Sequence, residues 1–200
     1  MKHRLGATFT LCFLAAILFS GCASTMCLQY AKPDAMARRK GSITVVVEDQ
    51  RPVEETGGDP ARVGTIRNSF GMPFALRSNP DRQPQIVIND LVSDCLGAAG
   101  YEVVEEKAGV PRLNVALKSF WSDGYQYSRM WLVISTALRK NQNSQPVWQI
   151  DFESSTGIVW TVGYGKFDEG FTKILEDAKK QLMIKFNDKK FHGSYASLLK

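Results

Sequence analysis

The sequence predicts an α+β fold: a two-layer sandwich in which an antiparallel-rich sheet of about five strands carries two helices on one face. Two observations favour this class. Three successive segments between residues 113 and 156 alternate apolar and polar side chains, as antiparallel strands do when one face is covered. Two other segments, one central and one near the C-terminus, repeat apolar residues at helical spacing. The expected order is β-α-β-β-β-β-α in a single domain over residues 42–190.

The first half of this domain is predicted to be a strand-helix-strand unit. Its first strand covers residues 42–48, because Ile43 to Val47 is a β-branched run. The helix begins at Pro84, which suits a first turn, and stops at Gly100. Its apolar residues at helical spacing are Ile88, Leu91, Val92, Cys95, Leu96 and Ala99. A short strand over 101–104 follows directly.

A long connection over residues 50–84 separates the first strand from the helix, and it is rich in proline, glycine and arginine. Connections of this length are unusual inside a compact domain. We therefore expect either a functional loop or a short irregular hairpin here. This segment is the first candidate for a binding surface.

The second half is predicted to be a meander of strands over 113–121, 125–140 and 147–156, with Asp123-Gly124 as the first turn signal. Residues 158–162 extend the last strand or lie beyond it. A final helix follows, capped by Asp168, and its apolar stripe consists of Phe171, Ile174, Leu175, Ala178 and Leu182. Residues 191–200 are expected to form a C-terminal tail.

Aromatic residues concentrate on the meander: Phe120, Trp121, Tyr125, Tyr127, Trp131, Trp148 and Trp160. Because strand side chains alternate between faces, these residues cannot all enter one core. An exposed patch would suit a protein, peptidoglycan or lipid ligand, and Trp121, Tyr125 and Tyr127 are the candidate binding residues. The alternative is that most of them fill the core and the others form ordinary cross-strand pairs.

The first 21 residues have the features of a secretory signal peptide. Three basic or histidine residues precede an apolar stretch that is too short for a membrane span of about 20 residues. The closing sequence Phe19-Ser20-Gly21-Cys22 resembles the bacterial lipobox. This resemblance implies cleavage between Gly21 and Cys22, and a covalent diacylglycerol and N-acyl chain on Cys22 that hold the protein on a membrane.

The residues after the cysteine indicate a location. Ala23 and Ser24 resemble the pattern that sorts Gram-negative lipoproteins to the outer membrane. We therefore expect the periplasmic face of the outer membrane in a Gram-negative source, and the cell membrane otherwise. Residues 22–41 are polar and small without a sustained period, so we expect the lipidated cysteine to be followed by a flexible tether.

Composition excludes several function classes. The formal net charge of +5 at pH 7 includes two basic residues of the signal, and no basic helix interleaved with aromatics occurs, so no nucleic-acid partner is expected. Once the signal is removed, His192 is the only histidine, which excludes a histidine-based triad and a multi-histidine metal centre within one chain. For Cys27 and Cys95, an incidental thiol and a buried thiol are favoured over a disulfide.

Two catalytic patterns are weak. Gly163-Tyr164-Gly165 lacks the residues that follow a phosphate-binding loop, so an ordinary connection is favoured. A carboxylate pair for glycosidic chemistry could come from a group of five acidic residues, but solubility and the helix dipole explain these residues more simply. The five are Asp49, Asp151, Glu153, Asp168 and Glu169. We expect no enzymatic activity, no metal, and no cofactor besides the acyl chains on Cys22.

One set of residues resembles the YajG-like family of bacterial lipoproteins. The set comprises Ile43 to Val47 running into Asp49-Gln50-Arg51-Pro52, then Val63-Gly64, Arg67-Asn68 and the helix end from Leu96 to Tyr101. The resemblance runs from Ser42 to the final helix and implies an envelope lipoprotein with an α+β domain and no established enzymatic activity. Independently, Asp49 and Arg51 lie two residues apart at a strand end. They are expected to pair with each other or with the Arg67 segment and to hold the long connection onto the sheet.

Together these patterns predict a lipid-anchored, periplasm-facing lipoprotein that binds or assembles an envelope protein or peptidoglycan partner. The alternative is an auxiliary lipoprotein of a lipid or solute transporter, with an apolar ligand groove between sheet and helix. A hydrolase is the third hypothesis. An aromatic surface patch, a lined cavity and converging carboxylates in a cleft would distinguish the three.

Overall fold

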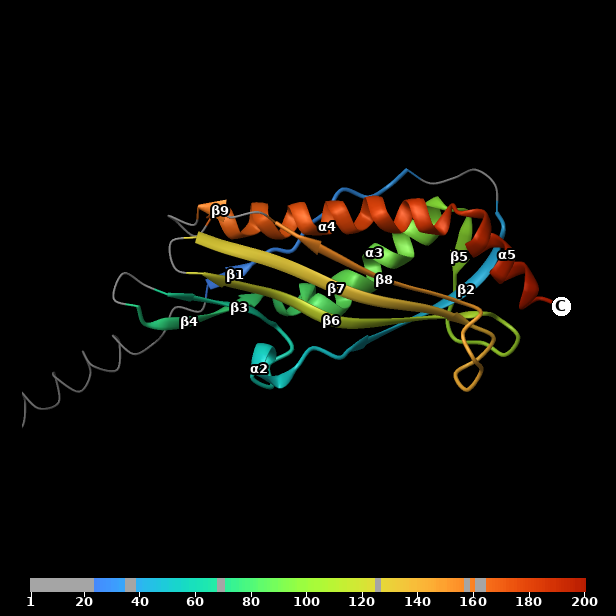
Figure 1. Cartoon of the computed structure of the whole chain (residues 1–200), viewed down its shortest axis with the longest axis horizontal. Coiled ribbons are helices and arrows are strands. Elements are labelled where there is room, and N and C mark those ends of the chain that lie inside the picture. The colour runs from blue at the N-terminus through green and yellow to red at the C-terminus, as the bar shows by residue number, and fades with distance from the viewer. Residues whose placement is uncertain (1–23, 35–38, 68–70, 125–126, 157–158, 161–164) are drawn as a thin grey trace, which may run out of the picture.

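The computed structural model describes residues 24–34, 39–67, 71–124, 127–156, 159–160 and 165–200. Within these residues nine strands join into one mixed sheet, accompanied by four α-helices and a 3-10 turn (Figure 1). The strands are β1 (Ser24–Met26), β2 (Gly41–Asp49), β3 (Arg62–Arg67), β4 (Pro73–Ser78), β5 (Tyr101–Val103), β6 (Arg112–Gly124), β7 (Tyr127–Arg139), β8 (Trp148–Ser155) and β9 (Val159–Trp160). The helices are α2 (Val53–Thr56), α3 (Pro84–Ala98), α4 (Gly165–Phe186) and α5 (Lys189–Ser197), and η1 (Pro80–Arg82) is the 3-10 turn.

The long antiparallel pair of β6 and β7 is the centre of the sheet. On its other side β6 has two successive neighbours, both parallel to it: β2 along its first half and β3 along its second half. The sheet therefore divides beyond β6. One branch continues through β2 to β5, and the other continues through β3 and β4 to β1.

Two helices, α3 and α4, cover one face of the sheet, and the short helix α2 lies on the opposite side (Figure 1). The covered face buries the apolar alternate residues of the strands. Phe120 of β6 and Phe171 of α4 are both fully buried, and their rings are stacked with the centroids 5.0 Å apart. A core of this kind stabilises the fold by roughly 25 cal/mol for each Å² of apolar surface removed from water.

The predicted fold class is correct at the level of α+β, but the predicted sheet is wrong in detail. It is mixed, with β1–β4, β2–β5, β2–β6 and β3–β6 parallel, and it contains more than five strands. The additional strands β3 and β4 lie in the proline-rich and glycine-rich connection, whose composition hid their pairing; the irregular-hairpin alternative is the one found. The helices also number more than two, because α2 and α5 are too short to give a sustained period.

Individual boundaries agree more closely. The helix expected from Pro84 ends at Ala98, and the strands expected over 42–48 and 147–156 are β2 and β8. The final helix begins at Gly165, so Asp168 lies in its first turn and is not the cap residue. Its position there still suits the positive end of the helix dipole.

The expected tether over residues 22–41 is partly folded onto the domain. β1 pairs in parallel with β4, and Leu28 is fully buried. The Tyr30 hydroxyl donates to Asp94 Oδ2 of α3 at 2.8 Å. A strand of three residues is too short for its pattern to be recognised in the sequence, because only its pairing with a distant strand identifies it.

The expected tail over residues 191–200 is mostly helical instead. Asp188 caps α5 by accepting from the backbone N–H of Lys190, and Phe191 and Tyr195 are buried one helical turn apart. The centroid of the Phe191 ring lies 4.9 Å from that of Trp148 and 5.1 Å from that of Phe186. The domain therefore extends to the end of α5.

Both described cysteines are free: Cys27 is half-buried and Cys95 is fully buried. Burial raises the pKa of the Cys95 thiol to about 12. Among the described residues, no cluster of three or more potential metal ligands occurs, and none of the helices has the length and apolar character needed to span a membrane.

Candidate functional site

The structure places the predicted site residues in three different situations. Gly21 and Cys22 lie outside the described residues, as do Tyr125 and the side chain of Tyr127. Asp49 and Arg51 meet where the sheet divides. Trp121 lies on the open face of the sheet, which is the face that α3 and α4 leave uncovered. Arg67 is exposed at the end of β3. The signal cleavage site and acylation site thus remain sequence predictions.

The Asp49–Arg51 pair closes the gap between β2 and β3. The Arg51 side chain is completely buried, and its Nε and Nη2 donate to the two carboxylate oxygens of Asp49 at 2.9 and 2.7 Å. Its remaining donors reach the backbone carbonyl oxygens of Pro60 and Arg62, both at 2.7 Å. This arrangement fixes residues 52–62 against the end of β2, so the pair has a structural role.

The gap exists because β2 and β3 contact different halves of β6. β2 ends its pairing at Asp49 opposite Leu117, while β3 begins opposite Ser122. Between these points the pairing of β6 with β7 shifts register, between Leu117 and Ser119. A register shift of this kind bends a strand and re-aims its side chains. It brings both Phe120 into the core and Trp121 onto the open face.

The helix α2 docks on the open face through a carboxylate. Glu55 Oε1 accepts from Ser119 Oγ at 2.8 Å, whereas Glu55 Oε2 is buried without a described partner. Burial raises the pKa of Glu55, against the opposing effects of the Ser119 hydrogen bond and the Arg51 charge. The open face therefore holds a partly buried carboxylate with a raised pKa close to the Asp49–Arg51 pair.

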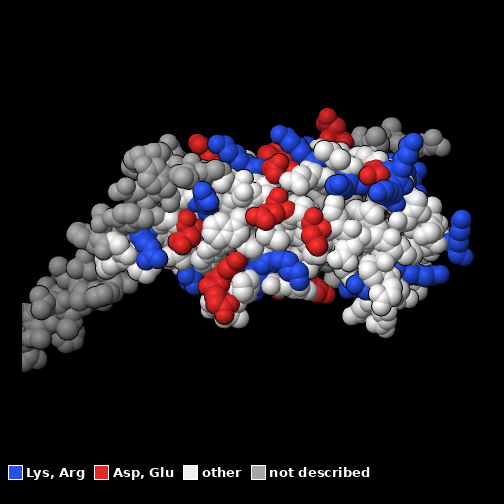
Figure 2. Space-filling model, viewed as in Figure 1, with Lys and Arg blue, Asp and Glu red and all other residues white. Residues whose placement is uncertain are grey.

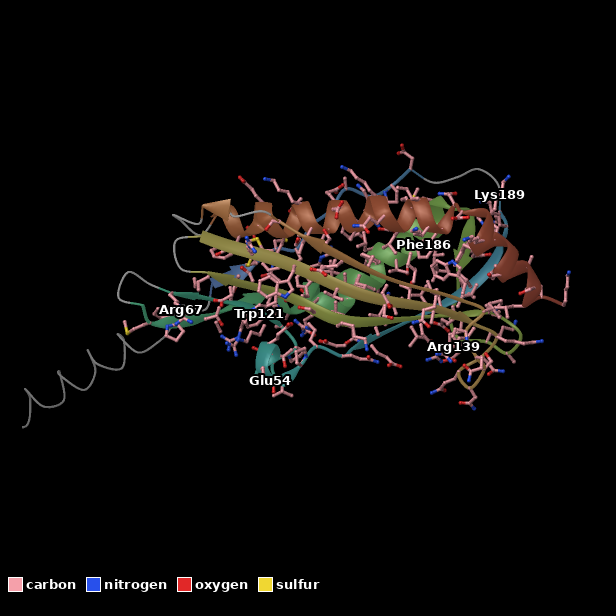
Figure 3. The ribbon with its side chains drawn as sticks, in the orientation of Figure 1. Glu54, Arg67, Trp121, Arg139, Phe186 and Lys189 are labelled. Atoms are coloured by element: carbon pink, nitrogen blue, oxygen red, sulfur yellow. The ribbon has the colours of Figure 1, made fainter. Side chains whose placement is uncertain are left out.

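Trp121 and Trp131 form a cross-strand pair on the same open face. They are direct partners in the β6–β7 register, and both are half-buried. The Arg62 guanidinium lies over the Trp121 ring, 5.3 Å from its centroid, and Arg62 Nη2 donates to Thr65 Oγ1 at 3.0 Å. A cation over an aromatic face contributes about 0.5–1 kcal/mol when exposed. Trp121 is therefore held in place by β3 (Figure 3).

An open recess lies beside Trp131. Its volume is about 540 Å³, and its described lining residues are Arg129, Trp131, Glu153, Ser155 and Thr156. Trp131 supplies an apolar wall, while Arg129 and Glu153 supply charges of both signs. A surface that combines a partly exposed tryptophan with polar groups around it is suited to binding, because ring burial gives affinity and the polar groups give orientation.

The charges of the described surface do not favour one sign of ligand. Figure 2 shows acidic and basic side chains interspersed over the face in view. Several of them are engaged with each other: Arg77 Nε donates to Asp59 Oδ2 at 2.6 Å, and this hydrogen bond lowers the pKa of Asp59. The recess is therefore better suited to a neutral or mixed partner surface than to a polyanion.

The other functional hypotheses find less support in this geometry. The side chains that pack between the sheet and the helices α3 and α4 are fully buried, including Leu91, Leu117 and Leu175, and the recess lies on the opposite face. An apolar groove between sheet and helix is thus not what the described residues form. Of the acidic residues considered for glycosidic chemistry, Asp49 is occupied by Arg51.

Sequence reasoning missed two contributors to this site. No sequence pattern points to Arg62, although its carbonyl oxygen accepts from Arg51 and its guanidinium lies over the Trp121 ring. Glu55 was also missed. Trp131 was noted only as one of the meander aromatics. The signal available in the sequence is the alternation of side chains along a strand. Trp131 and Glu153 are odd-numbered, like the more exposed residues of β7 and β8, so both belong to the same face.

Comparisons with known proteins give a fold and no family. No family model matches the chain, and no curated protein matches it. The structure is similar to that of a DUF330 protein from Xanthomonas campestris, with a TM-score of 0.60 and 13% identity over 87% of this chain and 99% of that chain. It is less similar to an uncharacterized protein, with a TM-score of 0.47 and 13% identity over 81% of this chain and 98% of that chain. For rare lipoprotein B from Shewanella oneidensis the TM-score is 0.34, with 11% identity over 67% of this chain and 94% of that chain. At these identities the likeness shows the fold alone.

Proposed function

We propose that the chain is a lipid-anchored, periplasm-facing lipoprotein of the bacterial envelope, related to the YajG-like family, and that its domain is a non-enzymatic binding or assembly module. The observation that carries the location is Phe19-Ser20-Gly21-Cys22 after a short apolar stretch. Similarity of fold to a DUF330 protein supports a shared architecture and does not address the partner. With Ala23 and Ser24 next, the outer membrane is the proposed destination.

The binding role is supported by the recess beside Trp131. A large aromatic side chain left partly exposed on a rigid sheet loses little conformational entropy when a partner covers it. Trp131 lies opposite Trp121 in the β6–β7 register, and the Arg62 guanidinium lies over the Trp121 ring. We propose that an envelope protein or peptidoglycan segment occupies this recess.

The anchor is tested by changing Cys22→Ser, with Cys27→Ser as the matched control. Acyl chains each contribute about 0.8 kcal/mol per buried CH₂, so the control is expected to stay in the membrane pellet and take up radiolabelled palmitate. The Cys22→Ser protein is expected to lose both the label and the membrane association. A labelled, membrane-bound Cys22→Ser protein would contradict the anchor.

The binding role is tested by photo-crosslinking in intact cells. A photoreactive phenylalanine derivative placed at Trp131 is expected to give a reproducible crosslinked product. The same group placed at Lys180, which is exposed on α4, serves as the control and is expected to give none. Equal products at both positions, or cleavage of an envelope polymer by the purified domain, would overturn the proposal.

A further inference from the structure

The start of the folded domain lies very close in sequence to the proposed acylation site. Cys22 is separated from Ser24, the first residue of β1, by a single residue. Two residues of fully extended chain span at most about 7 Å. β1 itself is fixed, because it pairs with β4 and because Met26 and Leu28 are buried in the core. The length of the chain therefore limits the distance between the proposed acylation site and the start of β1 to about 7 Å.

The register identifies that end. β1 is parallel to β4, with Ser24 opposite Leu76, so β1 begins on the side where β4 begins. Pro73, the first residue of β4, lies three residues before Leu76. At about 3.3 Å per residue, β4 reaches about 10 Å past Ser24, about 3 Å farther than the two-residue link to Cys22 can extend. Because a leaflet's headgroup layer is itself about 5–8 Å thick, the start of β4 reaches the layer in which the acylated cysteine sits.

This end of the molecule is formed by the end of β3 and the start of β4. Figure 1 shows the two strands reaching past the start of α4, and Figure 3 shows Arg67 at this end and Lys189 near the other. Arg67 and Pro73 are exposed, and Met72 between them is 52% exposed. An arginine next to an exposed apolar side chain matches the boundary between headgroup phosphates and acyl chains.

We infer that the β3–β4 end of the domain rests on the anionic lipid headgroups of the membrane that holds Cys22, with Arg67 at the phosphates and Met72 toward the acyl chains. The inference depends on the proposed acylation of Cys22. Figure 1 shows the start of α4, the helix that carries Asp168 and Glu169, set back from this end. The domain then stands on the membrane and is not suspended on a tether.

This orientation has a consequence for the opposite end. β6 contains 13 residues and runs along the long axis of the domain, so the turn between β7 and β8 lies about 40 Å from the membrane. The recess beside Trp131 lies near the membrane end, because Trp131 is only four residues from the start of β7. A partner in that recess would be held close to the bilayer surface.

The test uses the full acylated chain in vesicles of phosphatidylethanolamine and phosphatidylglycerol that carry a headgroup nitroxide quencher. A fluorescent thiol label is placed at Met72→Cys or, as the control, at the exposed Gln142→Cys in the distal turn, both in a Cys27→Ser background. Cys95 is fully buried and does not compete for the label. The Met72→Cys label is expected to lose most of its fluorescence, and the Gln142→Cys label to keep it. Arg67→Glu is expected to restore part of the loss at Met72→Cys.

The outcomes separate the inference from the proposed anchor. If the protein does not float with the vesicles, the acylation of Cys22 fails as a proposal, and the inference fails with it. If the protein floats but both labels are quenched equally or the Met72→Cys label is not quenched, the anchor stands and the membrane contact is wrong. In that case the β3–β4 end would be free for an envelope protein.

Discussion

The two faces of the sheet use neighbouring residues of the same strands for different purposes. On β6, Phe120 is fully buried against α4, while Trp121 beside it is only partly buried. On β7, Leu132 is fully buried, while Trp131 borders an open recess. All four residues are large and apolar, so residue type does not distinguish the faces. The helices do: a side chain covered by α3 or α4 contributes stability, and its uncovered neighbour is available for binding.

The largest difference between the faces is expected from truncating a ring on each. Phe171→Ala removes the ring stacked on Phe120 and leaves a cavity, so the free energy of unfolding is expected to fall by about 3–5 kcal/mol. Trp131→Ala on the open face is the matched variant and is expected to cost about 1 kcal/mol. Urea denaturation measures both. Equal losses would show that the open face is as tightly packed as the covered one.

A smaller effect is expected at the division between β2 and β3. Arg51→Met leaves the Asp49 carboxylate and two carbonyl oxygens without their donor, so the free energy of unfolding is expected to fall by about 3 kcal/mol. Arg67→Met, at an exposed arginine of the same branch, is expected to change it by about 0.5 kcal/mol or less. Equal, small losses in the free energy of unfolding for Arg51→Met and Arg67→Met would contradict the structural role of the Asp49–Arg51 pair.

The smallest effect concerns pH and the docking of α2 on the open face. Because burial raises the pKa of Glu55, the folded state binds more protons than the unfolded state in the pH range just above the ordinary glutamate value of 4.5. The contribution of Glu55 to the free energy of unfolding therefore falls as pH rises through that range. Glu55→Gln keeps an acceptor for Ser119 and removes the titration.

This prediction is checked by measuring the free energy of unfolding of both proteins between about pH 4 and pH 7. The free energy of unfolding of Glu55→Gln is expected to increase relative to that of the parent protein as pH rises. A difference that is independent of pH would mean that the Glu55 carboxylate is solvated in the folded protein, and that α2 is not docked through it.

The fold could be predicted from sequence where a pattern repeats within one element. The helix from Pro84 and the alternation along β6, β7 and β8 were expected, because each is encoded by neighbouring residues. The strand β1 was not expected, and β3 and β4 were expected only as a short irregular hairpin, one of two alternatives for the long connection. Their residues become strands by pairing with segments that lie far away in the chain, as Ser24 does with Leu76.

The candidate site could be predicted in part, for the same reason. Asp49 and Arg51 are two residues apart on one strand end, so their pairing was a local expectation, and the structure brings them together. The position of Arg62 over Trp121 was not available, because it depends on β3 reaching β6 in parallel across the gap that Arg51 closes. The register shift near Ser119 likewise has no simple sequence signal.

What the sequence by itself determined is the α+β class, the main helices and strands, and the expectation of a lipid anchor at Cys22, since all of these follow from short-range patterns. Tertiary structure alone decided that residues 24–26 pair with the sheet as β1, that the sheet is mixed, and that Trp121 and Trp131 lie on the open side. The physical reason is that burial depends on which distant segment arrives to cover a side chain. Helices α3 and α4 cover one face of β6 and β7, and the recess is on the face that they leave open.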